Sequence, residues 1–310
     1  MDSPERKPFF LEEHLNVNWL RPESALWDAI ASGHIAEHVF DPPSLDLGSG
    51  NGLFSFVTAG GALALSYDWY QNAEPEGFWE NRDIYDTVVD LPTKQSIVRS
   101  PRYVIDCALD HKVSLGRQAA ALGGFYRRVL IADATRTLPV GDATFQTVFS
   151  NILYWLDSPE EALRQVWRIL RPGGRALLCL QNTRFEEYCS SYRWEQSGSN
   201  LLRLVNCGRS QLGLWTISYR ELSAISARIG FEMMAHRYYL SPLTLKTWDI
   251  GLRPLSPVLI KMARRLSERD RLEVKLEWLE TLTPFLRELY ELDQKSTDQG
   301  GFHFVCLGKS

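Results

Sequence analysis

The stretch LDLGSGNG, residues 45–52, decides the fold of this 310-residue chain. The run Ser44–Leu47 predicts a short strand before it, and Leu53–Ala59 predicts a helix after it. Three glycines stand at alternate positions in the connection: Gly48, Gly50 and Gly52. Glycines there let the backbone turn tightly and leave no Cβ in the way of a ligand, while the helix start offers free N–H groups. The stretch therefore predicts a ligand-binding turn, with the spacing G-x-G-x-G rather than the G-x-G-x-x-G of dinucleotide sites.

Apolar runs and helical patterns alternate through the middle of the chain, which predicts an α/β fold with a mainly parallel sheet. The further predicted strands are Tyr103–Leu109, Arg128–Ala132, a strand beginning at Thr147–Ser150, Ala176–Leu180, Phe231–Tyr239 and Phe302–Leu307. The predicted helices between them are Lys112–Leu122, Pro159–Leu170 and Tyr219–Ile229. Ser158 and Pro159 begin the second of these helices, and RPGG at 171–174 stops it. Gly230 is expected to cap the third helix at its C-terminus.

Three stretches do not fit a minimal α/β core. We expect residues 1–40, helical around Glu23–Ile35, to form a lid, and residues 241–300, with helical patterns at 256–267 and 270–293, to form a substrate cap. The core then comprises 41–240 and 301–310, with an insert at 60–102 that is rich in turn formers over Asn81–Pro92. Eight of the ten tryptophans lie outside 103–180, so these additions carry apolar faces that must pack.

Composition excludes several classes of protein. The formal net charge of −4 gives no reason to expect a nucleic-acid partner, which would favour a basic stripe. The five cysteines are scattered without a C-x-x-C pair, which favours buried thiols over disulfides or zinc, and no H-E-x-x-H pattern predicts another metal site. No apolar signal core and no run of about 18 apolar residues occurs, so we expect a soluble cytoplasmic protein without an integral membrane segment.

Four motifs in order carry a family resemblance: DLGSGNG, IADA (131–134), LPVGDATFQTVFSNILYWL (138–156) and ILRPGGRALL (169–178). Together they resemble the class I S-adenosylmethionine-dependent methyltransferases, over about 44–60 and 103–182 and more weakly through 231–240 and 302–308. The L-R-P-G-G stretch is similar to the small-molecule branch of that family. The resemblance implies a Rossmann-like sheet whose last strand, here Phe302–Leu307, is antiparallel. It also implies S-adenosylmethionine as cofactor and S-adenosylhomocysteine as product.

In this family an acid at the end of the second strand bonds the ribose hydroxyls, and a carboxylate can accept from two adjacent hydroxyls. Two acids compete for the role. Asp110 ends the strand YVIDCAL and precedes a clear helix and a further strand. Asp68, in SYDWY, stands at the offset from Gly48 that is usual in dinucleotide sites. We prefer Asp110 because it completes an α/β unit, with Asp68 as the alternative.

The remaining cofactor candidates come from the loop, the strand ends and the N-terminal segment. The resemblance implies that Asp133 accepts from the adenine amino group, that the Ala134 N–H contacts the ring, and that Asn151 reaches the methionine part. Arg21 would grip the cofactor carboxylate, since arginine binds carboxylates bidentately. The other candidates are Asp46, near a cationic ligand, the loop residues Gly48, Ser49, Gly50 and Gly52, and His111, which follows the preferred ribose acid.

Candidates for the acceptor side are mostly aromatic. Tyr154 and Trp155 follow the fourth strand, where the family meets its acceptor, and Trp155 would stack on the acceptor or on the sulfonium. Trp248 and Arg253, in WDIGLRP, would line the same pocket. A general base is needed only when the acceptor keeps a proton of high pKa, and His14 and Tyr154 are the catalytic candidates. The segment NILY (151–154) lacks the prolines of N-P-P-Y enzymes, which counts against nucleobase and glutamine acceptors.

The sequence therefore predicts a methyltransferase for a small or medium organic acceptor that works by in-line displacement. An alternative is a protein of the same fold that binds the cofactor but catalyses another reaction or is a silent partner subunit. An NAD-linked oxidoreductase is disfavoured by the glycine spacing and by the D-A and R-P-G-G segments. The basic amphipathic stretch 256–271 would lie on a membrane surface or, as we prefer, form a cap helix with a solvated face.

Overall fold

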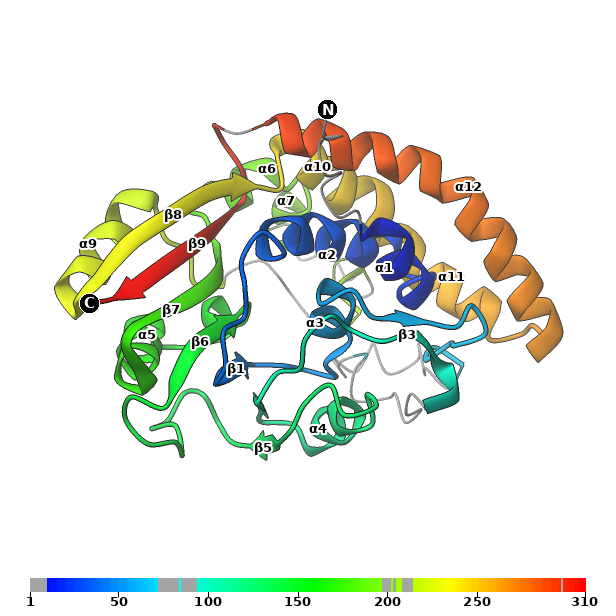
Figure 1. Cartoon of the computed structure of the whole chain (residues 1–310). Coiled ribbons are helices and arrows are strands. Elements are labelled where there is room, and N and C mark those ends of the chain that lie inside the picture. Colours follow the sequence, from blue (N-terminus) through cyan, green and yellow to red (C-terminus); the bar gives the residue numbers. More distant parts are fainter. Residues whose placement is uncertain are drawn as a thin grey trace, which may run out of the picture.

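A seven-stranded sheet organises the chain, with the strand order β5-β4-β1-β6-β7-β9-β8. The computed structural model describes residues 10–71, 84, 94–196, 202, 205–207, 214–296 and 298–310. The strands of the sheet are β1 (Ser44–Leu47), β4 (Cys107–Asp110), β5 (Val129–Ile131), β6 (Phe145–Ser150), β7 (Leu170–Gln181), β8 (Phe231–Tyr239) and β9 (Phe302–Lys309). The first five of these pair in parallel, and β9 lies antiparallel between β7 and β8. The predicted α/β Rossmann-like sheet with an antiparallel last strand is confirmed (Figure 1).

Helices cover both faces of this sheet. The α-helices are α1 (Leu11–Val17), α2 (Pro22–Ile35), α3 (Leu53–Thr58), α4 (Val113–Ala120), α5 (Pro159–Ile169), α6 (Phe185–Tyr188), α7 (Tyr192–Gln196), α9 (Tyr219–Ile229), α10 (Pro242–Lys246), α11 (Ser256–Ala263) and α12 (Glu268–Lys295). One apolar cluster packs α2, α3 and α4 on one face, and a second packs α5 and α9 on the other. Residues on β1 alternate between the clusters, so Leu45 and Leu47 face α5 while Asp46 faces the other side. The glycine turn therefore follows a strand that is packed on both of its faces.

Several predicted boundaries need correction. The strand predicted at Tyr103–Leu109 is confined to β4, because residues before Cys107 make only the isolated bridge of Ile105 with Tyr126. Helix α5 ends at Ile169, just before RPGG as predicted, but the strand predicted at Ala176–Leu180 begins earlier, so that RPGG lies inside β7. The register of β6 and β7 shifts between Phe145 and Thr147, so the extra residues form an irregularity within the pair. By contrast β1, α9 and β8 have the predicted bounds, and Gly230 caps α9 with a φ of 107°.

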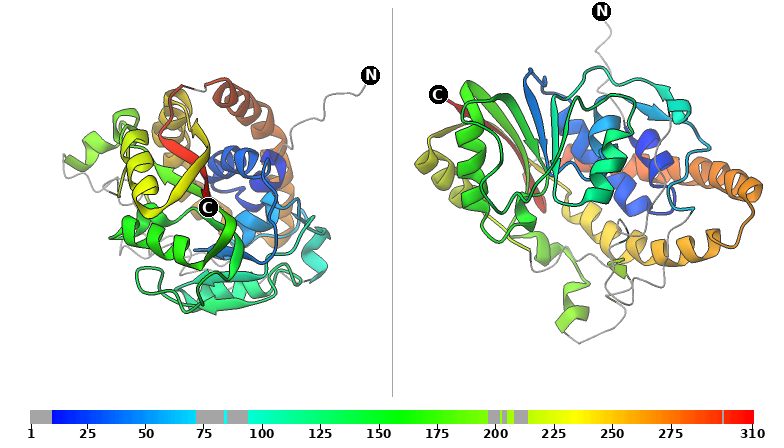
Figure 2. Two further views of the ribbon diagram at one scale, coloured as in Figure 1. Left: turned by 60° about the vertical axis from the view of Figure 1, so that its left-hand side comes forward. Right: turned by 90° about the horizontal axis from the view of Figure 1, so that it is seen from below.

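The N-terminal and late helical segments pack on each other beside the sheet. Figure 1 shows α2 between the sheet and α12, and the right-hand view of Figure 2 shows α11 and α12 extending away from the strands. Trp278 Nε1 donates to the Trp19 carbonyl at 2.9 Å. Arg271 Nη2 lies 2.6 Å from Asp68 Oδ2, and Lys275 Nζ donates to the Tyr67 carbonyl at 2.7 Å. The start of α12 is thus bound to the 67–70 segment through buried polar contacts.

Shorter elements complete the described parts. A two-stranded ribbon pairs β2 (Ala62–Leu63) with β3 (Ile97–Arg99), after the 3₁₀ turn Lys94–Ser96. A 3₁₀ turn at Leu153–Trp155 follows β6, and a π-helix at Thr247–Leu252 continues into the 3₁₀ turn Arg253–Leu255. Most of the predicted turn-rich stretch 81–92 lies outside the described residues. The five cysteines are buried, and among the described helices none is long and apolar enough to cross a bilayer.

Candidate active site

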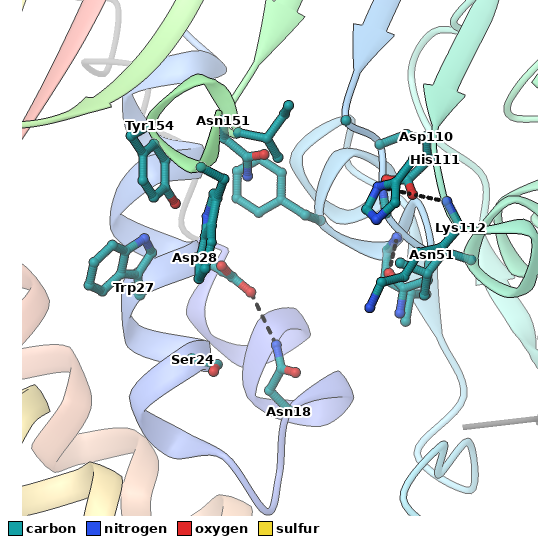
Figure 3. Close-up of a pocket in the computed structure, with 18 of the residues that line it drawn as sticks. Asn18, Ser24, Trp27, Asp28, Asn51, Asp110, His111, Lys112, Asn151 and Tyr154 are labelled. Carbon is teal, nitrogen blue, oxygen red and sulfur yellow. Dashed lines mark hydrogen bonds and ion pairs between the residues drawn. The ribbon is translucent and has the colours of Figure 1, made fainter. Parts of the chain in front are cut away.

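A cavity of about 710 Å³ opens at the carboxyl ends of the parallel strands. Ligands of open α/β sheets bind at this edge, where the strand order reverses between β1 and its two neighbours. Figure 3 shows Asn51, Asp110 and His111 on one side of the cavity and Trp27, Asp28 and Tyr154 on the other. The glycine turn and the N-terminal helices therefore line the same cavity.

The glycine turn has a conformation that only glycine adopts without strain. Gly48, Gly50 and Gly52 have φ angles of 81°, 56° and 77°. A Cβ on Gly48 would lie 2.0 Å from Ile152 Cγ1, and one on Gly52 would lie 2.7 Å from the Tyr126 ring. A Cβ on Gly50 would meet no heavy atom within 4 Å. The outer two glycines are thus required by packing, and the middle one faces open space in the cavity wall.

Asp110 ties the glycine turn to the neighbouring strand. Its Oδ2 accepts from the Gly50 N–H at 2.9 Å, and its Oδ1 accepts from the Lys112 N–H at 2.8 Å. The side chain is buried at the end of β4, beside β1, and lines the cavity. The His111 ring next to it is largely exposed on the cavity rim, with Nδ1 3.5 Å from Asp110 Oδ1.

Asp68, the alternative acid, is placed elsewhere. It is not among the lining residues, and its Oδ1 accepts from Trp19 Nε1 at 3.0 Å while Oδ2 faces Arg271. Asp46 also lies outside the lining. It is buried beneath the turn, where Tyr126 Oη donates to it at 2.6 Å and where burial raises its pKa to about 6. Asp68 thus links the 67–70 segment to α12, and Asp46 supports the glycine turn through Tyr126.

One buried polar atom in the glycine turn lacks a protein partner. Ser49 Oγ makes no hydrogen bond within the described part of the chain, although the residue is only 8% exposed. Ser49 lines the cavity, so a bound polar ligand would satisfy its hydroxyl. Across the cavity rim, Asp133 is exposed and accepts from the Thr135 N–H and hydroxyl, which lower its pKa. Ala134 and Asn151 complete this part of the lining.

Aromatic side chains form the other wall. The lining aromatic residues there are Trp27, Phe54, Trp69, Tyr154, Trp155 and Trp248. Trp27 and Trp248 have ring centroids 5.1 Å apart, and the Arg253 guanidinium lies 4.3 Å above the Trp248 ring. Arg253 is buried and pairs with Asp249 at 2.9 Å, so its charge is neutralised within the protein. The predicted acceptor-side residues Tyr154, Trp155, Trp248 and Arg253 therefore all reach the cavity.

The N-terminal candidates His14 and Arg21 also line the cavity. His14 is buried, with Nε2 2.8 Å from Ser32 Oγ, and burial lowers its pKa to about 3. A ring with that pKa is neutral and a weak base at neutral pH. Arg21 Nε donates to Glu23 Oε1 at 2.9 Å, which orients the guanidinium beside the cavity.

Comparison with family models finds a match over part of the sheet described above. Residues 102–178 match the family model for a methyltransferase domain. This match and the strand order support a class I S-adenosylmethionine-dependent methyltransferase domain. Its cofactor is S-adenosylmethionine, and the orphaned Ser49 hydroxyl and the open face of Gly50 fit a polar ligand at the glycine turn.

Among solved structures, the chain is similar to a SAM-dependent methyltransferase from Thermotoga maritima, with 14% identity, 92% of this chain and 90% of that chain covered and a TM-score of 0.46. It is also similar to an S-adenosylmethionine-dependent methyltransferase from Mesorhizobium loti, with 14% identity, coverage of 90% and 98% and a TM-score of 0.45. The [4+2]-cyclase SpnF matches at 15% identity, with coverage of 93% and 82% and a TM-score of 0.47. A search of curated proteins found no match.

Asp28 is a charged cavity residue that the sequence did not single out. Asp28 lies on α2 in the run ALWDAI, where it is the one acid in an apolar helical stretch. It lines the methyltransferase cavity between the aromatic wall and α1 (Figure 3). The signal that could have marked Asp28 as a candidate is its isolation in an apolar helical stretch. A buried acid there needs a polar neighbour or a ligand.

Proposed function

We propose that this methyltransferase transfers the methyl group of S-adenosylmethionine to a small or medium-sized organic acceptor held against the aromatic wall. The observation that carries the proposal is the continuity of one cavity from the glycine turn to Trp27, Tyr154 and Trp248. Its volume of about 710 Å³ lies in the range typical of pockets for small ligands.

On this proposal the two ends of the cofactor are held by different strands. The glycine turn with Ser49 and Asn151 binds the methionine part, and Arg21 binds its carboxylate. Asp110 accepts from the ribose hydroxyls, because it already fixes the turn and lies at the end of the strand beside β1. Asp133 and Ala134 bind the adenine, while His111 borders the ribose on the rim. Asp46 supports the turn from below through Tyr126.

The chemistry needs alignment and exclusion of water more than acid–base assistance. The bound cofactor supplies an electrophilic methyl group on a sulfonium. The protein's residues orient the acceptor: Tyr154 and Trp155 lie after β6, and Trp248 faces Trp27. The predicted lid 1–40 and acceptor cap 241–300 each contribute lining residues from their described parts, which supports these two roles. Desolvation by these aromatic rings favours displacement at the sulfonium, whose charge is lost in the reaction.

A label-transfer experiment tests this function. The protein is incubated with methyl-labelled S-adenosylmethionine and chromatographic fractions of a metabolite extract, and labelled small molecules and S-adenosylhomocysteine are quantified. We expect stoichiometric appearance of both from at least one fraction. Binding of the cofactor without label transfer to any small-molecule fraction would instead favour the silent-partner alternative. A fraction from which label moves only to macromolecules would contradict the small-acceptor proposal.

A further inference from the structure

The Asp28 carboxyl group lies inside the cavity and is not needed by the cofactor assignments above. Asn18 Nδ2 donates to its Oδ2 at 3.2 Å. Its Oδ1 receives no hydrogen bond from the described residues. Figure 3 shows Asp28 with Trp27 and Tyr154 on the α2 side of the cavity. One oxygen is thus held by the protein, and the other is available to a ligand.

Burial sets the pKa of the Asp28 carboxyl group near neutral pH. Burial raises the pKa of Asp28 to about 7, while Arg21 and the hydrogen bond from Asn18 oppose this shift. Glu23 on the same helix adds to the rise, and Tyr239 on β8 also faces the carboxyl group. A group that changes its protonation near the working pH is suited to accept a proton during a reaction.

The other candidates for such a role are committed to protein partners. His14 is bonded to Ser32 and remains neutral down to a pH of about 3. Glu23 is buried between Arg21 and the Ser256 hydroxyl, which donates to it at 2.5 Å. Among the described lining residues, Asp28 alone combines a carboxyl oxygen without a protein donor with a position at the aromatic wall.

The rings next to Asp28 indicate the shape of its partner. Trp27 adjoins Asp28 in sequence, packs against Trp248 and Phe302, and is only partly buried. Tyr154 packs edge-on against Phe302 at 5.0 Å and presents its other side to the cavity. Flat ligands stack favourably on such rings. An aromatic acceptor would fit between them with its polar group directed at the carboxylate.

We propose that Asp28 is the proton acceptor for the nucleophilic hydroxyl or amine of an aromatic acceptor held by Trp27, Tyr154 and Trp248. This inference rests on the proposed function. In the step, the acceptor oxygen or nitrogen forms a bond to the methyl carbon, and the carbon–sulfur bond breaks with its electron pair remaining on sulfur. The O–H or N–H proton passes to Asp28 Oδ1 and then to solvent. Charge balances, since the sulfonium becomes a neutral thioether and the carboxylate becomes a carboxylic acid.

The competing role for Asp28 is to bind the ammonium group of the cofactor, and a variant series separates the two. Asp28→Asn removes the charge at constant size, Asp28→Glu restores an acid, and Asp157→Asn is the matched control at an exposed position outside the lining. Binding of S-adenosylhomocysteine is measured first, by titration calorimetry. We expect all variants to bind it within about twofold of the wild type, whereas a tenfold loss confined to Asp28→Asn would overturn the proposal.

Binding of small probes gives a readout that does not depend on activity. In the presence of S-adenosylhomocysteine, phenethylamine, 4-ethylphenol and 3-phenylpropionate are titrated and tryptophan fluorescence is followed. The wild type should bind the amine and the phenol at least tenfold more tightly than the carboxylate, and Asp28→Asn should lose this preference. Phenethylamine stays cationic between about pH 5.5 and 8.5, because alkylamines titrate near 10. Its affinity should therefore rise through about pH 7 in the wild type and stay flat in Asp28→Asn.

The rate of methyl transfer provides the last readout, once a fraction of the metabolite extract has been found that contains an acceptor. Loss of a general base typically costs about 10²–10⁴-fold. We expect Asp28→Asn to lose at least 100-fold in kcat with an unchanged KM for S-adenosylmethionine, and Asp28→Glu to recover part of it. An unchanged kcat or equal probe affinities in Asp28→Asn would overturn the proposal. If the wild type fails to bind S-adenosylhomocysteine, the proposed function fails instead, independently of Asp28.

Discussion

Replacing Gly50 by alanine tests whether the cofactor lies on the glycine turn. Gly50 has a φ of 56°, and a Cβ built there meets no heavy atom within 4 Å. The free energy of unfolding of the variant should therefore fall by about 1 kcal/mol, which is the cost of placing an L-residue in the left-handed region. That cost corresponds to a fall in melting temperature of about 2–4 °C. The new methyl group would nevertheless fill the space over the turn, so we expect at least a tenfold loss of S-adenosylmethionine affinity, about 1.4 kcal/mol.

Gly124→Ala is the matched control for this variant. Gly124 also has a positive φ, 85°, and a Cβ added to it would likewise meet no heavy atom within 4 Å, but it does not line the cavity. Differential scanning fluorimetry should show similar small losses for both variants, and calorimetry should show weakened binding only for Gly50→Ala. Equal affinities in Gly50→Ala and the wild type would refute the placement of the cofactor over Gly50.

Three further changes have distinct expected outcomes. Asp110→Asn should weaken S-adenosylhomocysteine binding at least tenfold in calorimetry, and unchanged binding would exclude Asp110 as the ribose partner. Asp68→Asn should leave that affinity unchanged but lower the free energy of unfolding by about 3 kcal/mol in urea titrations, because it leaves buried Arg271 without its charge partner. The pKa values of His236 and His303 are lowered to about 4 by burial, so stability should fall as the pH drops from about 6.5 toward 4. His303→Gln should show a smaller loss of melting temperature over this range, and an identical loss would contradict the assignment.

The parts of the fold that sequence predicted best depend on neighbours in the chain. The turn after β1 needs glycine at each position where φ is positive, and α9 begins with the capping box of Ser218 and Glu221. Gly230 then ends that helix in the left-handed conformation. These signals lie within a few residues of the structure that they determine, so the strand–turn–helix unit could be predicted directly.

The features that sequence left open depend on residues far apart in the chain. The sequence favoured Asp110 over Asp68 but kept both, and the pairing of β4 with β1 is what places Asp110 beside the glycine turn. The partner of Asp68, Arg271, lies 203 residues away, beyond the reach of any local pattern. Asp28 shows the same limit, since Tyr239, which faces it, lies at the end of β8, far from α2 in the chain. The RPGG segment follows the end of α5 as predicted, but local propensity does not reveal its irregular pairing with β6 inside β7.

Titration calorimetry with S-adenosylmethionine and with NAD, on the same preparation, tests the central claim most directly. The strand order, the glycine turn and the unpartnered Ser49 hydroxyl predict saturable binding of one S-adenosylmethionine per chain and no heat from NAD. Absence of S-adenosylmethionine binding at millimolar concentration, with saturable binding of NAD, would contradict the account.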